Sequence, residues 1–140
     1  MKPNRIPYRA CTLVLAGAIA AIAAPSMAWR ATNNHTVNPL SATSFEVIGR
    51  GGISSIDYWC AAGDYARRAL GAPLDQRIYI SRARGEAETE NAKSAVQFSL
   101  EPPVGSDLRP AFLLTVTRIG DNLSAWAAWN YCLPQTGAEG

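Results

Sequence analysis

The residues best suited to binding are tyrosines and arginines in the middle of the chain. Both types are enriched at binding hot spots, where they bury a large area and make hydrogen bonds. Seven of them lie around a predicted helix and the strand after it, and they form the candidate binding surface: Tyr58, Tyr65, Arg67, Arg77, Tyr79, Arg82 and Arg84. The sequence favours a simpler interpretation, that these residues line a half-exposed sheet face.

The sequence contains no convincing catalytic or metal-binding group. Its single histidine, His35, lies in a polar, aperiodic segment, which weakens a Ser-His-Asp site and a histidine metal site alike. The carboxylates nearest the predicted core are Glu46, Asp57 and Asp64, and the last two fall on the outer face of a helix. We therefore expect no catalytic residues, no metal and no cofactor, and an enzyme is the less favoured class.

The first 28 residues predict a secretory signal peptide. Basic residues at positions 2, 5 and 9 precede an apolar run over residues 10–24, and a small-x-small sequence ends at Ala28. The run is shorter than the about 20 residues of a membrane-spanning helix. The sequence thus predicts export to the periplasm or the medium, with no stable membrane insertion after cleavage.

Cleavage after Ala28 changes the charge balance and the cysteine count. Thirteen Lys and Arg minus three in the leader leaves ten, against eleven Asp and Glu, so no electrostatic case for nucleic acid remains. Cys11 is removed, which leaves Cys60 and Cys132 in an oxidising compartment. We expect them to form one disulfide, with a redox pair or a lone nucleophile as weaker alternatives.

The pattern of apolar residues predicts an α+β fold. It indicates strands over residues 44–50, 76–82, 94–100 and 111–117, a central helix over 54–71, and a short C-terminal helix that begins at Asp121 or Asn122. We expect a mostly antiparallel four-stranded sheet, in the order β-α-β-β-β-α, with the central helix on one face. The first two strands are candidates for parallel neighbours joined by a right-handed crossover.

The predicted domain boundaries follow from these elements. Residues 29–43 are expected to be a flexible lead-in, 44–133 a single globular domain and 134–140 a disordered tail. Within the domain, residues 83–93 are expected to form a solvated loop without a calcium site.

Helical spacing assigns faces to the two helices. Ser54 or Ser55 caps the central helix and Gly71 ends it. Ile56, Trp59, Gly63, Ala66 and Leu70 should face the core, and Asp57, Ala61, Asp64 and Arg68 the solvent, with Gly63 allowing close approach to the sheet. Phe112, Leu114 and Val116 should point inward from the fourth strand, and Trp126, Trp129 and Leu133 should pack on the core from the second helix. An aromatic surface for a carbohydrate is the alternative for the tryptophans.

Three stretches resemble a group of small exported bacterial proteins of unassigned function. They are residues 45–50 (FEVIGR), 57–66 (DYWCAAGDYA) and 94–98 (SAVQF). The resemblance covers about residues 43–132 and includes both cysteines. It implies export and a single domain, and it implies no activity.

The function that the sequence favours is a binding or structural module whose partner is a protein or a small ligand in the periplasm. The alternative is a small hydrolase or an inhibitor of one. A pocket that holds convergent carboxylates, or a carboxylate with an arginine, would favour this alternative.

Overall fold

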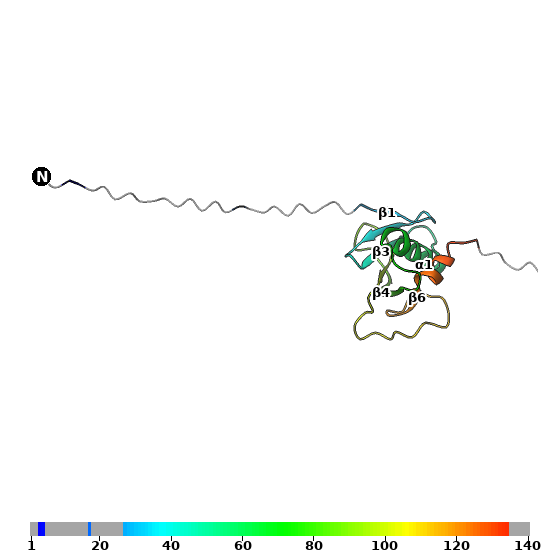
Figure 1. The fold of residues 1–140 in the computed structure, drawn as a ribbon. Coiled ribbons are helices and arrows are strands. Elements are labelled where there is room, and N and C mark those ends of the chain that lie inside the picture. Colours follow the sequence, from blue (N-terminus) through cyan, green and yellow to red (C-terminus); the bar gives the residue numbers. More distant parts are fainter. Residues whose placement is uncertain (1–2, 5–16, 18–26, 135–140) are drawn as a thin grey trace, which may run out of the picture.

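Six strands form one antiparallel sheet in the computed structural model, which describes residues 3–4, 17 and 27–134. The order across the sheet is β1-β2-β3-β5-β4-β6, and helix α1 covers one face with α2 packed beside it (Figure 1). The strands are β1 (Trp29–Arg30), β2 (Thr36–Pro39), β3 (Ser44–Gly49), β4 (Arg77–Gly85), β5 (Ser94–Ser99) and β6 (Asn122–Ser124). The helices are α1 (Ser55–Asp64), its continuation as the π-helix η1 (Tyr65–Ala69), and α2 (Ala125–Asn130).

The predicted α+β class, with an antiparallel sheet and two helices, is confirmed, but the prediction of four strands is wrong. Strands β1 and β2 lie in residues 29–43, which were expected to be a flexible lead-in. A tight turn joins them, in which Asn34 has a φ of 70° and Ala31 N donates to His35 O at 2.9 Å. Val37 is fully buried in the core, so this hairpin is an integral part of the fold.

The predicted strand over residues 111–117 does not form. The segment belongs to the connection between β5 and β6, and it makes scattered contacts with β4, such as the 3.0 Å bond from Arg84 N to Val116 O. Val116 is buried, but Phe112 is exposed, and the neighbour of β4 over Arg77–Tyr79 is β6. The parallel crossover is also wrong, since β3 pairs antiparallel with β2 and β5.

The ends of the central helix are as predicted, and its faces are so in part: Trp59, Gly63 and Ala66 are buried as expected, whereas Ile56 is exposed. Ser54 and Asp57 form a reciprocal capping box at the start, and Gly71 takes a left-handed φ of 65° after the end. Ala61 and Asp64 were expected to face solvent and are buried, because the β1–β2 hairpin and α2 cover that side. Asp64 pairs with Arg68 as predicted, and it also accepts a 2.8 Å bond from Thr32 N.

Gly63 approaches a helix rather than the sheet. A Cβ at this position would lie 2.8 Å from the carbonyl carbon of Ala128 and closer still to Trp129 N, both in the backbone of α2. The predicted disulfide between Cys60 and Cys132 is confirmed, with a Cα–Cα distance of 4.7 Å, and it holds the two helices together.

Helix α2 turns its small residues toward α1. Ala125 and Ala128 are buried, whereas Trp126 and Leu133, which were predicted to pack on the core, are exposed. The helix begins after Ser124, whose hydroxyl accepts a 3.1 Å bond from Ala127 N, and residues 122–124 form β6 instead of a first helical turn.

Two predictions concern terminal residues that the structure does not describe in full. Most of the predicted signal peptide over residues 1–28, and residues 135–140 of the predicted tail, fall outside the described residues. Among the residues that are described, no helix has the length and apolarity needed to cross a membrane.

The contact at Gly63 gives a first test. Gly63→Ala should lower the free energy of unfolding by about 1–3 kcal/mol, because the added methyl group overpacks the helix pair. This sign is opposite to that of helix propensity, which favours alanine by about 1 kcal/mol. The measurement is urea denaturation, with Gly85→Ala as the control, since a Cβ there has no neighbour nearer than 3.7 Å. A more stable Gly63→Ala variant would show that α2 yields at this contact.

Candidate functional site

The seven residues of the candidate binding surface are not brought together. Tyr58 and Tyr65 are buried: the Tyr58 hydroxyl bonds Ser94 Oγ at 2.6 Å, and burial of Tyr65 raises its pKa. Arg84 lies over the Tyr58 ring and donates to Ile53 O at 2.6 Å, so it seals the edge of the core. The contacts of these three residues are with the protein's own core, which indicates a role in stability.

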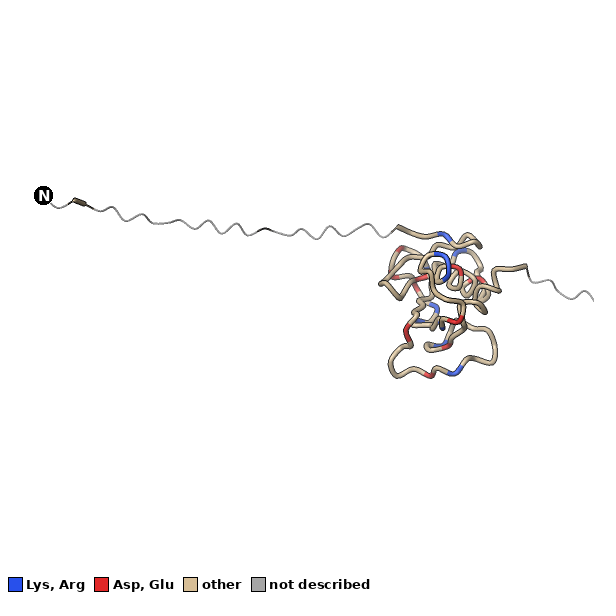
Figure 2. Tube along the Cα trace, in the orientation of Figure 1, with Lys and Arg blue, Asp and Glu red and all other residues tan. Residues whose placement is uncertain are grey.

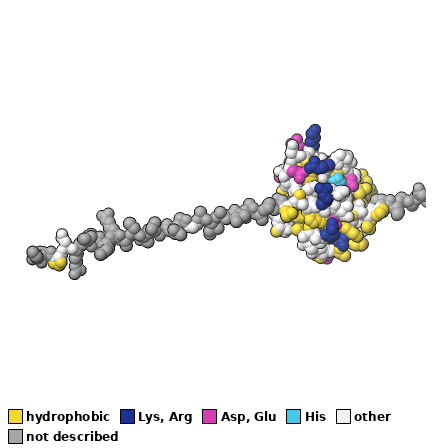
Figure 3. Space-filling model, turned by 90° about the horizontal axis from the view of Figure 1, so that it is seen from above, with side chains coloured by type: hydrophobic (Ala, Val, Ile, Leu, Met, Phe, Trp, Pro, Cys, Tyr) yellow, Lys and Arg dark blue, Asp and Glu magenta, His cyan; other side chains and the backbone are white. Residues whose placement is uncertain are grey.

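The other four occupy three separate places. Arg67 lies over the Trp129 ring, 4.2 Å from its centroid. Arg77 and Tyr79 alternate with the buried Ile78 and Ile80 along β4, and Arg82 lies further along, near a buried carboxylate. Acidic and basic residues are interspersed along the chain trace (Figure 2). Basic side chains are spread across the face in Figure 3, with acidic and apolar ones beside them.

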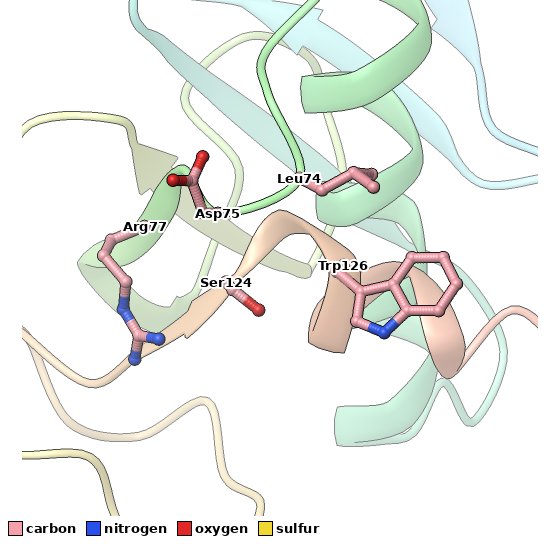
Figure 4. Close-up of a pocket in the computed structure, with 5 residues that line it drawn as sticks. All are labelled: Leu74, Asp75, Arg77, Ser124 and Trp126. Carbon is pink, nitrogen blue, oxygen red and sulfur yellow. The ribbon is translucent and has the colours of Figure 1, made fainter.

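A hollow of about 490 Å³ lies where β4 and β6 meet the start of α2 (Figure 4). It is lined by Leu74, Asp75, Arg77, Ser124 and Trp126. Two backbone bonds hold its walls together, from Ala125 N to Gln76 O at 2.8 Å and from Trp126 N to Leu74 O at 3.0 Å. The hollow is therefore built on the anchored start of α2.

Arg77 is the basic residue of the hollow, and Asn122 holds it in place. Its Nε donates to Asn122 Oδ1 at 3.0 Å, and Nη2 donates to the same oxygen and to Asn122 O. Asn122 is itself buried, and its Nδ2 donates to Leu108 O and Gly120 O. Within the described part of the chain, no carboxylate pairs with Arg77, so its positive charge is available to a ligand.

Trp126 supplies an apolar surface on the other side of the hollow. It is 47% exposed, and its ring centroid lies 5.7 Å from that of Trp129, which in turn carries Arg67. The contact with Trp129 restricts the orientation of the exposed Trp126 ring. From the sequence, Trp126 was predicted to lie in the core. The spacing of Ala125 and Ala128 is a signal for the opposite orientation, in which the small side chains face α1.

The hollow contains a carboxylate and an arginine, but they do not converge. The Asp75 carboxylate and the Arg77 guanidinium point in opposite directions in Figure 4, and no ion pair joins them. Nor do the described residues contain a group of three or more side chains suited to a metal ion. The arrangement provides a fixed cation and an exposed indole, which suits binding of an anionic group that carries a ring or another flat apolar face.

Glu46 is a second polar centre, on the opposite face of the sheet from α1. It is completely buried and accepts hydrogen bonds from Glu88 N, Thr89 N, Thr89 Oγ1 and Gln97 Nε2 at 2.6–3.1 Å. Arg82 Nη1 lies 3.8 Å away. The loop that was expected to be fully solvated therefore folds back over β3 at residues 88–89. With its oxygens occupied in this way, Glu46 is a structural carboxylate.

The protonation of Glu46 is coupled to folding. Burial alone would raise its pKa, but the hydrogen bonds from Thr89, Gln97 and Glu88 outweigh burial, and the pKa lies below its ordinary 4.5. A lowered pKa in the folded state adds stability above the unfolded value, and this stability is lost as the pH falls through the folded value.

Replacement of Glu46 tests this coupling. Glu46→Gln should lower the free energy of unfolding at pH 7 by about 2–3 kcal/mol, because the amide nitrogen would face hydrogen-bond donors. The difference from the original chain should shrink as the pH falls from 4.5 toward the lower pKa of folded Glu46, because Glu46 is protonated first in the unfolded chain. Urea denaturation from pH 7 to pH 3 measures this, with Glu101→Gln as an exposed control. A difference that does not depend on pH would contradict the lowered pKa.

Comparisons with known proteins give no relative of this chain. No family model matches it, and no curated protein and no solved structure matches it significantly.

Proposed function

We propose that this chain is an exported binding module, and that the hollow between Arg77 and Trp126 is its ligand site. The observation that carries the proposal is the guanidinium of Arg77, which has no carboxylate partner among the described residues and is fixed by Asn122 at the edge of an apolar hollow. A cation held rigidly in this way loses little entropy when it binds an anion. The disulfide agrees with an oxidising compartment.

The ligand chemistry follows from the two sides of the hollow. Arg77 suits a carboxylate or another planar anion, because the planar fork of guanidinium donors matches the two oxygens of a carboxylate. The exposed indole of Trp126 suits the flat face of a ring, and Ser124 lies between the two (Figure 4). An acidic carbohydrate combines a carboxylate with ring faces, so it is the ligand class that we propose.

The hydrolase alternative has less support. Asp75 and Arg77 share the hollow, which is the combination that would favour it, but their charged groups diverge and Asp75 has no second carboxylate beside it there. A glycosidase needs two carboxyl groups across the scissile bond. The geometry of the hollow thus supports binding better than hydrolysis.

The proposal is tested with trigalacturonic acid as the probe and a neutral trisaccharide as its uncharged counterpart. The acidic probe should change the tryptophan fluorescence in a saturable manner, and the neutral one should bind at least tenfold more weakly. Arg77→Gln should weaken binding of the acidic probe by about 10- to 100-fold, because a hydrogen bond to a charged group is lost. Trp126→Ala should weaken it as well.

Arg109→Gln is the matched control, because it removes an exposed arginine that is not part of the hollow. It should leave the affinity unchanged. Equal binding of both probes, or an Arg77→Gln variant that binds the acidic probe as well as the original chain does, would refute the proposed site. Thermal unfolding of each variant separates lost binding from lost folding.

A further inference from the structure

The connection between β5 and β6 runs over residues 100–121 without a helix or strand. Connections longer than about 12–15 residues without regular structure are uncommon in compact domains and are usually functional or disordered. In Figure 1 this segment projects as a wide loop beyond the ends of β4 and β6. Its hydrogen bonds show which parts of it are fixed.

Residues 112–114 form the tip of this loop, and the part before the tip is tied by side chains from the end of the same connection and from Asn122 of β6. Carbonyl oxygens of residues 107–109 accept bonds from Arg118 and from Asn122, with 2.7 Å from Arg118 Nη1 to Asp107 O and 2.7 Å from Asn122 Nδ2 to Leu108 O. Ala111 N then donates to Asp121 Oδ1 at 2.9 Å. Asp121 and Asn122 are both buried, so these ties reach into the body of the protein.

The part after the tip is tied as firmly. Trp59 Nε1, in the core, donates to Thr115 O at 3.0 Å, and Arg84 N in β4 donates to Val116 O at 3.0 Å. Val116 is itself buried. Both flanks of residues 112–114 are therefore held by the folded domain.

Between these ties the chain exposes two consecutive apolar side chains. Phe112 is fully exposed and Leu113 is 73% exposed, and neither residue makes a hydrogen bond within the described part of the chain. Full burial of a phenylalanine or leucine side chain is worth about 1.5–3 kcal/mol. The tip thus exposes two apolar side chains and unpaired backbone groups, and the segments on both sides of it are held by hydrogen bonds.

We propose that residues 110–114 bind the active-site cleft of an endopeptidase with an apolar primary pocket, with Phe112 in that pocket, and that this chain inhibits the enzyme. Such a cleft offers hydrogen-bond partners to the backbone of an inserted loop and a pocket for one side chain. Fixed flanks lower the entropy cost of binding. This proposal does not rest on the ligand site proposed at Arg77.

A protein cleft fits the tip better than a lipid surface does. Insertion of a loop into an anionic membrane gains from unpaired basic residues beside the apolar ones. The basic residue nearest the tip, Arg109, is paired with Asp107 at 2.8 Å, and this arginine holds the pKa of Asp107 below its usual range. The ion pair therefore leaves Arg109 without a free charge for lipid headgroups.

The test measures inhibition of two serine endopeptidases, one chymotrypsin-like and one subtilisin-like, with a chromogenic peptide substrate. The original chain should inhibit at least one of them competitively, and mass spectrometry should find the Phe112–Leu113 bond cut far more slowly than in a free peptide of residues 106–118. Phe112→Ala should raise the inhibition constant by at least about 30-fold, the loss expected for a hot-spot residue. Val104→Ala, which trims another fully exposed apolar residue of the same loop, should change it less than about twofold.

A second variant tests the fixed base of the loop. Arg118→Gln removes the ties to residues 107 and 109, so it should turn the loop from an inhibitor into a substrate that is cut near Phe112. Thermal unfolding confirms that each variant is folded.

Three results would overturn the proposal. The first is no inhibition of either enzyme, and the second is rapid cleavage of the original chain without inhibition. The third is binding to vesicles of phosphatidylglycerol and phosphatidylcholine that Phe112→Ala abolishes, without inhibition, which would assign the tip to a lipid surface.

Discussion

The contact of α1 with α2 at Gly63 is the constraint on which the other features depend. Backbone meets backbone there because no Cβ intervenes, and the Cys60–Cys132 disulfide holds the same pair of helices. The contact fixes the direction in which α2 leaves β6. Trp126 is turned outward as a result, because Ala125 and Ala128 occupy the side that faces α1. The hollow thus owes its apolar wall to a glycine that is distant from it.

The face of the sheet opposite α1 is covered in a different way. There the buried charge of Glu46 is compensated by hydrogen bonds from the loop that folds over it and from Gln97 of β5, and not by a helix. Removing a charge from water is costly unless each of its oxygens is satisfied, so the loop and the carboxylate require each other. A segment rich in glutamate, which looks like a solvated linker, is in this way part of the folded structure.

Local patterns predicted the elements that local chemistry determines. The alternation of Val96 and Phe98 locates β5, and the cap at Ser54 and the glycine at position 71 locate the ends of the central helix. Strands of two to four residues carry too little pattern to be recognised, and β1, β2 and β6 are of that kind. Residues 111–117 carry the strand pattern, but the sequence does not reveal that β6 takes the edge of β4. For the same reason Arg77 was a candidate from the start, whereas its partner Asn122, 45 residues later, was not.

Asn122 connects the hollow with the long loop. Its Oδ1 accepts from Arg77 at the hollow, and its Nδ2 donates to Leu108 O at the base of the long loop and to Gly120 O. An aspartate would pair well with Arg77, but it would bring a negative oxygen against two carbonyl oxygens and release the loop. A serine or an alanine would release both. Because only an amide has an acceptor and a two-hydrogen donor on one short side chain, a single asparagine orients the cation of the hollow and fixes the base of the exposed tip.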